Sequence, residues 1–166
     1  MLINYLYWGI YDDYTVRKLE PRGNKPILIR ILEPSYKRNN KIPYKIETID
    51  KYIVLELYFD DISEYPPEKY KDRFVLFDIN MAKKLVSFIE KHDFDEIVVH
   101  CSQGISRSSA IMVCISRILN LPEIEKTIYK CGRFKPNNLI LNEFSKIKYN
   151  KKYTKCTLVN TNNISI

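Results

Sequence analysis

The sequence lacks any long apolar run and has few cysteines, and each absence argues against a class of protein. No apolar stretch in the 166 residues reaches 18 residues, so we expect no membrane-spanning helix. Residues 1–8 are apolar but have neither a basic flank nor a small-residue cleavage site, so we expect no signal peptide. The four cysteines form no C-x-x-C pair and are too sparse for a disulfide framework, which argues against a zinc cluster and a disulfide scaffold. We therefore expect an intracellular, cytoplasmic protein.

Internal repeats and low-complexity segments are also absent. Apolar residues make up 45% of the chain and aromatic residues 13%, which is enough for a packed interior and excludes a disordered chain. The length suits one domain with one core, which we assign to residues 1–150, followed by a basic and polar tail at 151–166. The formal net charge of +7 favours acidic partners such as phosphorylated proteins, nucleic acid or anionic lipid, but does not choose among them.

Short apolar runs alternate with helical patterns along the chain, which indicates an α/β fold. We expect a central, mostly parallel sheet of about four to five strands flanked by helices. Two polar, proline-containing segments, 35–50 and 60–77, predict loops, and a loop as long as the second is often functional. After Tyr149 we expect a loosely held tail with one edge strand at 157–160. The other predicted strands are 2–8, 27–32, 52–59 and 96–100. The predicted helices are 12–19, 78–91, 107–119, 122–130 and a last helix opened by Pro136. Asp78 is the expected N-cap of the second of these helices, and Gly132 is the expected C-terminal stop of the fourth.

The segment HCSQGISRS, residues 100–108, joins a predicted buried strand to a predicted buried helix. A tight loop that enters a helix points several backbone N–H groups at one spot, and the helix dipole adds partial positive charge there, so the loop favours a dianion such as phosphate. Gly104 lets the backbone turn inward without a Cβ penalty. The same field stabilises a thiolate on Cys101, and the planar guanidinium of Arg107 can hold two phosphate oxygens. One loop therefore supplies a nucleophile, an anion cradle and a bidentate clamp.

The pattern His-Cys-x5-Arg-Ser resembles the signature of cysteine-based protein tyrosine phosphatases, and HCSQGISRSSA looks most like their dual-specificity branch. Downstream, RFKPNNLILNEF resembles a stretch that these enzymes carry two helices later. Upstream, the strand that ends in Phe59-Asp60-Asp61 resembles the strand that delivers their general-acid loop. The resemblance runs over about residues 27–147 and is specific near Cys101. It implies a dual-specificity phosphatase-like fold and a phosphocysteine intermediate, with no metal or other cofactor.

The resemblance also implies individual roles within the motif. Cys101 would be the nucleophile, and the hydroxyl of Ser108 would donate to its sulfur in the second step, beside a role as helix N-cap. We expect His100 to steady the loop and the thiolate by hydrogen bonding rather than to act as a base. The phosphate would be bound by Arg107 and by the backbone amides of Ser102, Gln103, Gly104, Ile105 and Ser106.

The general acid is expected on the loop that follows the preceding strand. Asp60 and Asp61 are both candidates, with Asp72 a distant third. Alternation along the strand places Leu57 and Phe59 on one face, and Asp61 continues that face, so we favour Asp61 over Asp60. The resemblance to bacterial relatives, which share a Phe-x-Asp-Ile pattern, gives the same preference.

We therefore expect a cysteine-dependent phosphatase that hydrolyses phosphate monoesters, above all phosphotyrosine on proteins and also phosphoserine or phosphothreonine, and that acts as a monomer. RNA 5′-triphosphate and phosphoinositide are alternative substrates for the same chemistry. The loop lacks the Lys that relatives acting on inositol lipids often carry, and the RNA reading rests on net charge. A catalytically silent phospho-binding module is an alternative of a different class. Cys114 and Cys131 are either redox partners of Cys101 or core thiols, and the apolar helix around Cys114 favours the core.

Overall fold

The apolar runs of the sequence form one parallel sheet in the computed structural model, which describes residues 2–152 and 154–162. Its strands lie in the order β3-β2-β4-β1-β5, and every neighbouring pair is parallel. All residues of β2 and β4 are buried, as expected for central strands of a sheet that is covered on both faces. The predicted α/β class with a parallel sheet of four to five strands is therefore confirmed. The strands are β1 (Leu2–Tyr11), β2 (Pro26–Leu32), β3 (Ile53–Tyr58), β4 (Glu96–His100) and β5 (Lys155–Asn160).

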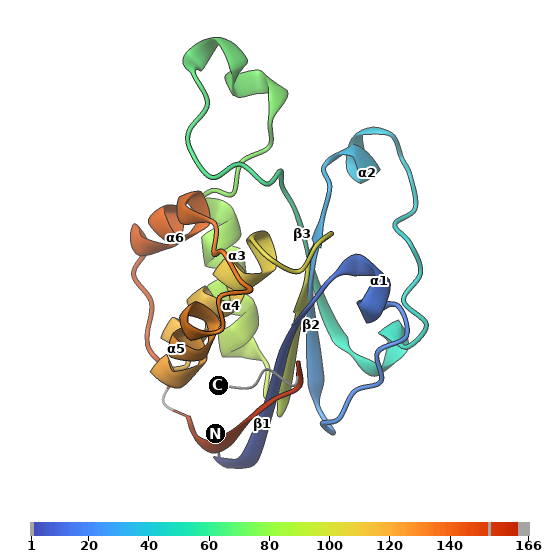
Figure 1. Cartoon of the computed structure of the whole chain (residues 1–166), viewed down its shortest axis with the longest axis vertical. Helices are drawn as coiled ribbons and strands as arrows, with labels where there is room; N and C mark the ends of the chain where they lie inside the picture. Colours follow the sequence, from blue (N-terminus) through green and yellow to red (C-terminus); the bar gives the residue numbers. More distant parts are fainter. Residues whose placement is uncertain (1, 153, 163–166) are drawn as a thin grey trace.

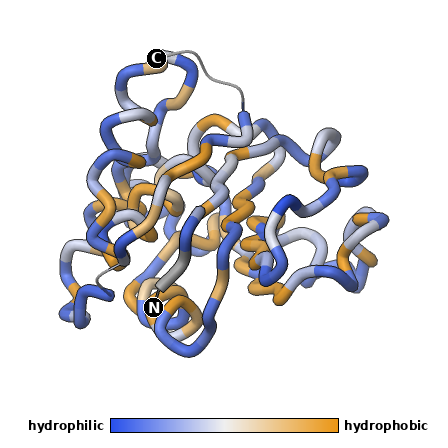
Figure 2. Tube along the Cα trace, turned by 90° about the horizontal axis from the view of Figure 1, so that it is seen from below, coloured by the Kyte–Doolittle hydropathy of each residue, from blue (hydrophilic) through white to orange (hydrophobic). Residues whose placement is uncertain are grey.

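Four helices cover one face of the sheet (Figure 1). The central helix, α4, is buried along nearly its whole length. It packs against the other three helices of this face and against strands β1 and β4 of the sheet. Each of the other helices buries one apolar side, as an amphipathic helix on a sheet does. Figure 2 shows apolar residues gathered inside the fold and polar residues along most of the outer loops. These helices are α3 (Ile79–Lys91), α4 (Arg107–Ile118), α5 (Pro122–Lys130) and α6 (Asn138–Ser145).

The opposite face of the sheet is covered by shorter elements, on the side of α1 and α2 in Figure 1. They are α1 (Asp13–Val16), α2 (Ser35–Arg38) and the 3-10 turn η1 (Ile49–Lys51). A second, smaller apolar cluster lies beneath them. It contains Tyr11, Val16, Leu28, Ile46, Tyr52 and Val98.

Several helix ends follow the predicted signals. The side chain of Asp78 accepts a hydrogen bond from the N–H of Met81 at the start of α3, and Gly132, with φ +68°, follows the end of α5. The last helix differs from the prediction, because Asn137 rather than Pro136 opens it. The Asn137 carboxamide oxygen accepts from the N–H of Ile140 and caps α6.

The remaining differences concern the chain between regular elements. The predicted helix 12–19 is a single turn capped by Asp12, and the predicted loop 35–50 contains α2 and the start of η1. The predicted loop 60–77 contains a 3-10 helix, η2 (Glu68–Arg73), and stands away from the body above α6 (Figure 1). None of the helices within residues 2–152 and 154–162 has the length and apolar character that crossing a lipid bilayer requires.

The segment after Tyr149 is held more firmly than its composition predicted. The expected edge strand is present as β5 and pairs with β1. Beyond it, the Thr161 hydroxyl lies 2.5 Å from the Tyr11 hydroxyl, and the Asn162 side chain bonds the N–H and the carbonyl of Ile10 at 2.8 and 2.6 Å. The expectation of a loosely held tail is therefore wrong for residues 155–162.

Candidate active site

The site lies on the loop between β4 and α4, at the carboxyl end of the sheet. Cys101 follows β4 directly, and only 2% of its surface is exposed. Its Sγ lies 3.1 Å from the Ser108 hydroxyl and accepts a hydrogen bond from the Gly104 N–H at 3.3 Å. The Cys101 N–H donates to the carbonyl of Tyr11 at 3.3 Å, which ties the loop to the end of β1. The sulfur is therefore fixed in place, with two groups able to donate to it.

Gly104 is required by the close approach of the loop to β1. Its φ is +66°, in the left-handed region that side chains disfavour. A Cβ at this position would lie 2.6 to 2.8 Å from backbone atoms of Tyr11 and Asp12. The positive φ confirms the expectation that Gly104 lets the chain turn inward. The backbone of Tyr11 and Asp12 packed against Gly104 is a second reason why no side chain fits there.

Arg107, the first residue of α4, is buried with its guanidinium held across the loop. Nη1 donates to the carbonyl of Phe59 at 2.9 Å, and Nη2 donates to the Ser102 hydroxyl at 2.7 Å and to a carboxylate oxygen of Glu33 at 2.5 Å. Nε is buried and has no hydrogen-bond partner among the described residues. A buried donor without a partner is costly, so this edge of the guanidinium suits an anionic ligand.

The two candidate acids face different partners. Asp61 lies beside the loop, where its Oδ1 accepts from the Ser106 hydroxyl at 2.8 Å and from the Asn137 side-chain amide at 2.9 Å. Asp60 has other partners: its Oδ2 accepts from the N–H of Val75 at 2.8 Å and lies 3.9 Å from Arg38. The geometry therefore brings Asp61, and not Asp60, to the loop that carries Cys101.

Asn137 connects three parts of the site, and sequence reasoning gave it no role. Its N–H donates to the carbonyl of Ser106 at 3.3 Å, and its side-chain amide donates to Asp61 and to the carbonyl of Ile62. Nearby, the N–H of Lys135 donates to the carbonyl of Ile105 at 3.1 Å. Asn137 thus joins the loop, the acid-bearing segment and α6. Its position just before an apolar helical pattern is the signal from which the sequence could have predicted Asn137 as an N-cap.

His100 is fully buried behind the loop. Its Nδ1 lies 3.1 Å from the Tyr44 hydroxyl, and its Nε2 has no hydrogen-bond partner among the described residues. Burial, assisted by the nearby positive charge of Arg30, lowers the pKa of His100 to about 3. The imidazole is therefore neutral at physiological pH and already engaged on one side by Tyr44.

A row of polar side chains crosses the sheet beneath the loop. Glu56, Arg30, His100 and Tyr11 are paired in register on four neighbouring strands, β3, β2, β4 and β1. Arg30 is only 4% exposed, and its Nη1 bonds the Glu56 carboxylate at 2.9 Å. Sequence reasoning missed this row, although a lone Arg inside the apolar run Pro26–Leu32 is the signal that would have found it.

The structure brings together Cys101, Gly104, Ser106, Arg107 and Ser108 with Asp61. Ser102 and Gln103 are exposed on the loop, and Ile105 is half-buried. All four cysteines are free, and Cys114 lies in the core of α4, where burial raises the pKa of its thiol. That burial makes Cys114 a poor nucleophile.

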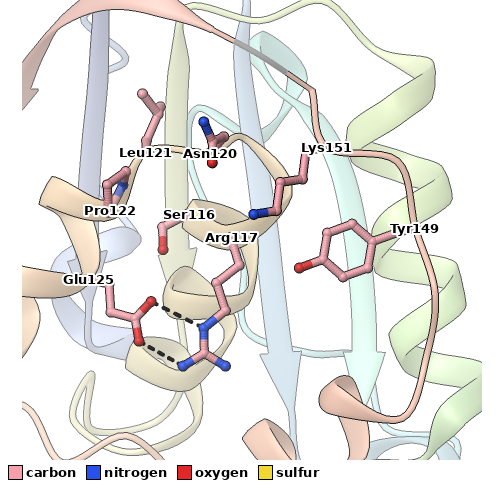
Figure 3. Close-up of a pocket in the computed structure, with 8 residues that line it drawn as sticks. All are labelled: Ser116, Arg117, Asn120, Leu121, Pro122, Glu125, Tyr149 and Lys151. Atoms are coloured by element: carbon pink, nitrogen blue, oxygen red, sulfur yellow. Dashed lines mark hydrogen bonds and ion pairs between the residues drawn. The ribbon is translucent and has the colours of Figure 1, made fainter.

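A pocket of about 240 Å³ lies at the other end of α4 (Figure 3). Among its three charged lining residues, Arg117 and Glu125 are bonded to each other at 2.7 and 3.1 Å. None of the residues around Cys101 lines it. The other lining residues are Ser116, Asn120, Leu121, Pro122, Tyr149 and Lys151.

The chain matches no known family model, and no curated protein sequence matches it either. Among the described residues, no three His, Cys, Asp or Glu side chains are grouped so that they could hold a metal ion.

Proposed function

We propose that the chain is a cysteine-dependent phosphatase that hydrolyses phosphate monoesters, with phosphotyrosine on proteins as its main substrate. One observation carries the proposal. The Cys101 sulfur sits at the mouth of a strand-to-helix loop, within 3.3 Å of the Gly104 N–H and the Ser108 hydroxyl, beside a buried Arg107 whose Nε has no partner among the described residues. The loop thus combines a nucleophile, the N-terminus of a helix and an arginine with one nitrogen that has no partner in the described part of the chain, which suits attack on a bound phosphate.

In the first step, the Cys101 thiolate attacks phosphorus and a sulfur–phosphorus bond forms as the ester oxygen–phosphorus bond breaks. Loop amides and the Arg107 guanidinium stabilise the phosphoryl oxygens as charge shifts. Asp61 in its acid form donates a proton to the leaving oxygen. Because Ser106 and Asn137 both bond Oδ1, Oδ2 is the oxygen left to carry that proton.

In the second step, water attacks the phosphocysteine. The Asp61 carboxylate takes a proton from the water, the sulfur–phosphorus bond breaks, and inorganic phosphate leaves. The Ser108 hydroxyl, 3.1 Å from Sγ, donates to the sulfur as it regains negative charge. The net reaction consumes one water and returns the enzyme to its starting state.

Asp61 favours catalysis over mere phosphate binding. A carboxylate at the rim of an anion cradle repels a phosphate dianion, so a module that only binds phosphate gains nothing from it. Two hydrogen bonds nevertheless hold Asp61 there. A catalytic acid explains the arrangement, because its proton is needed within reach of the leaving oxygen.

The test is hydrolysis of an aryl phosphate in excess chelator by the wild type, Cys101→Ser and the control Cys131→Ser, which changes a half-buried thiol on another helix end. We expect the wild type and the control to be active and Cys101→Ser to lose turnover by several orders of magnitude while still binding phosphate. Near-wild-type turnover by Cys101→Ser would refute the proposal. An active enzyme is then compared on phosphotyrosine and phosphoserine peptides, RNA 5′-triphosphate and inositol lipid.

A further inference from the structure

The lid segment, residues 60–77, carries Asp61 and is closed at its base by two hydrogen bonds within the segment. The Asp60 N–H donates to the Val75 carbonyl at 2.7 Å, and the Val75 N–H donates back to the Asp60 carboxylate at 2.8 Å. Between these two residues the chain leaves the body and returns, and most of it is exposed. Its placement over the loop therefore depends on the contacts that the lid segment makes beyond its base.

Besides the bond from Ser106 to Asp61 and the packing of Ile62 on the core, the polar contacts of the lid segment are made to α6, near both ends of that helix. At the first end, Asn137 bonds Asp61 and the carbonyl of Ile62. At the other, the Tyr65 hydroxyl donates to the carboxylate of Glu143, and the Lys146 ammonium bonds both the Tyr65 hydroxyl, at 3.1 Å, and Glu143. The helical rise places these two attachments about 9 Å apart along α6, so together they fix an orientation and not only a point.

Glu143 is the member of this second attachment that favours a closed lid. Its side chain is 8% exposed, whereas that of Lys146 is 49% exposed. A buried carboxylate needs its hydrogen-bond donors, so lifting Tyr65 away leaves Glu143 with one partner fewer inside the protein. The cost of that loss holds the lid segment down on α6.

We propose that Tyr65, through Glu143 and Lys146, is a positioning residue that holds Asp61 over the Cys101 loop. The inference rests on the proposed function, since it concerns the delivery of the acid in that reaction. Tyr65 itself touches no reacting atom. It acts on the fraction of molecules in which Asp61 stands ready to protonate the leaving oxygen.

The experiment compares Tyr65→Phe with the wild type on two aryl phosphates. Phenyl phosphate has a poor leaving group that needs the acid, whereas a phosphate of a strongly acidic phenol leaves without it. We expect Tyr65→Phe to lower kcat/KM on phenyl phosphate by about threefold to tenfold, the range for one hydrogen bond to a charged acceptor, and to change kcat/KM on the acidic phenol ester much less. The ratio kcat/KM is compared because it reports formation of the phosphocysteine, whereas kcat also contains the hydrolysis step, in which Asp61 acts on every ester. Tyr70→Phe is the control. Tyr70 is in the same lid segment, and its ring contacts the cations of Lys69 and Arg73, which also belong to that segment.

A double variant tests the route of the effect. If Tyr65 acts through Glu143, then Glu143→Gln combined with Tyr65→Phe loses little more than the larger single loss. Equal losses on both esters would instead mean general damage to the site, and no loss on phenyl phosphate would mean that Tyr65 does not position the acid. Either result overturns the proposal while leaving a Cys101-dependent phosphatase intact.

Hydrogen exchange tests the attachment without relying on turnover. We expect amides of residues 62–65 to exchange faster in Tyr65→Phe than in the wild type, with no such change in Tyr70→Phe. Unchanged exchange would overturn the attachment. If the Cys101→Ser variant keeps its activity, the proposed function fails instead. Failure of the Tyr65 proposal and failure of the proposed function therefore give different results.

Discussion

Two glycines separate the roles of backbone conformation and close packing at the site. Gly104 and Gly132 have almost the same φ, +66° and +68°. A Cβ on Gly104 would lie 2.6 Å from the backbone of Tyr11, whereas a Cβ on Gly132 would meet nothing within 4 Å. Alanine at either position is therefore strained by φ, but only at Gly104 does it also collide with the end of β1.

The expected magnitudes follow from that difference. The left-handed region costs alanine about 1–2 kcal/mol, and the stiffer unfolded chain returns part of it, so Gly132→Ala should lose about 1 kcal/mol of unfolding free energy. Gly104→Ala adds the overpacking of rigid backbone, about 1–3 kcal/mol more. Because the Gly104 N–H donates to the Cys101 sulfur, the same displacement should also disturb the nucleophile.

The assay is urea unfolding together with aryl phosphate hydrolysis. We expect Gly132→Ala to keep its turnover with an unfolding free energy about 1 kcal/mol lower, and Gly104→Ala to be less stable than Gly132→Ala and to lose at least about tenfold in kcat. Equal stability of the two variants, or full turnover by Gly104→Ala, would refute the packing argument.

Two further predictions concern acid and base groups. Asp61→Asn should slow phenyl phosphate hydrolysis by about a hundredfold or more, because the variant has no proton to give the leaving oxygen. Asp60→Asn should keep most of the wild-type rate, because an Asn oxygen can still accept from the N–H of Val75. Steady-state kinetics measures both rates, and the reverse pattern would move the acid to Asp60. The pKa of His100 is about 3 in the fold and near 6.5 in the unfolded chain, so its neutral form contributes stability that is fully present above about pH 6.5 and is lost as pH falls toward 3. Between pH 7 and pH 5 the wild type should lose about 1–2 kcal/mol more unfolding free energy than His100→Asn, and equal losses in urea titrations would contradict a buried neutral His100.

The sequence predicted the local parts of the site better than its long-range contacts. Cys101, Gly104, Arg107 and Ser108 could be placed together because they lie on one short loop between a strand and a helix. Asp61 was preferred by strand alternation, and the structure brings it beside Ser106. The loop itself needed only periodicity and the chemistry of neighbouring residues, whereas the roles expected of Ser108 and of an acid after the preceding strand came from the resemblance to cysteine-based phosphatases.

The missed residues reach the site from distant parts of the chain. Glu33 meets Arg107 across 74 positions, and Tyr44 meets His100 across 56. No periodic pattern encodes such pairs, because strand order rather than chain order decides which loops meet. The edge strand at 157–160 was expected, but the contacts of Thr161 and Asn162 with β1 were missed for the same reason, since strand order is not visible in a polar segment.

Strand order also explains why the anion cradle can be rigid. The ends of four adjacent strands each support the loop: β1 through the Tyr11 carbonyl, β2 through Glu33, β3 through the Phe59 carbonyl, and β4 by leading directly into Cys101. Parallel strands bring their carboxyl ends to one edge, so a single loop there can be held from both sides. Two of these supports, Glu33 and the Phe59 carbonyl, bond Arg107. Because its long side chain is already ordered, less conformational entropy is lost when an anion binds. The fixed position of the Arg107 guanidinium is thus a consequence of sheet topology, while Asp61, the proposed acid on the lid segment, is bonded by a side chain of α6's cap, Asn137.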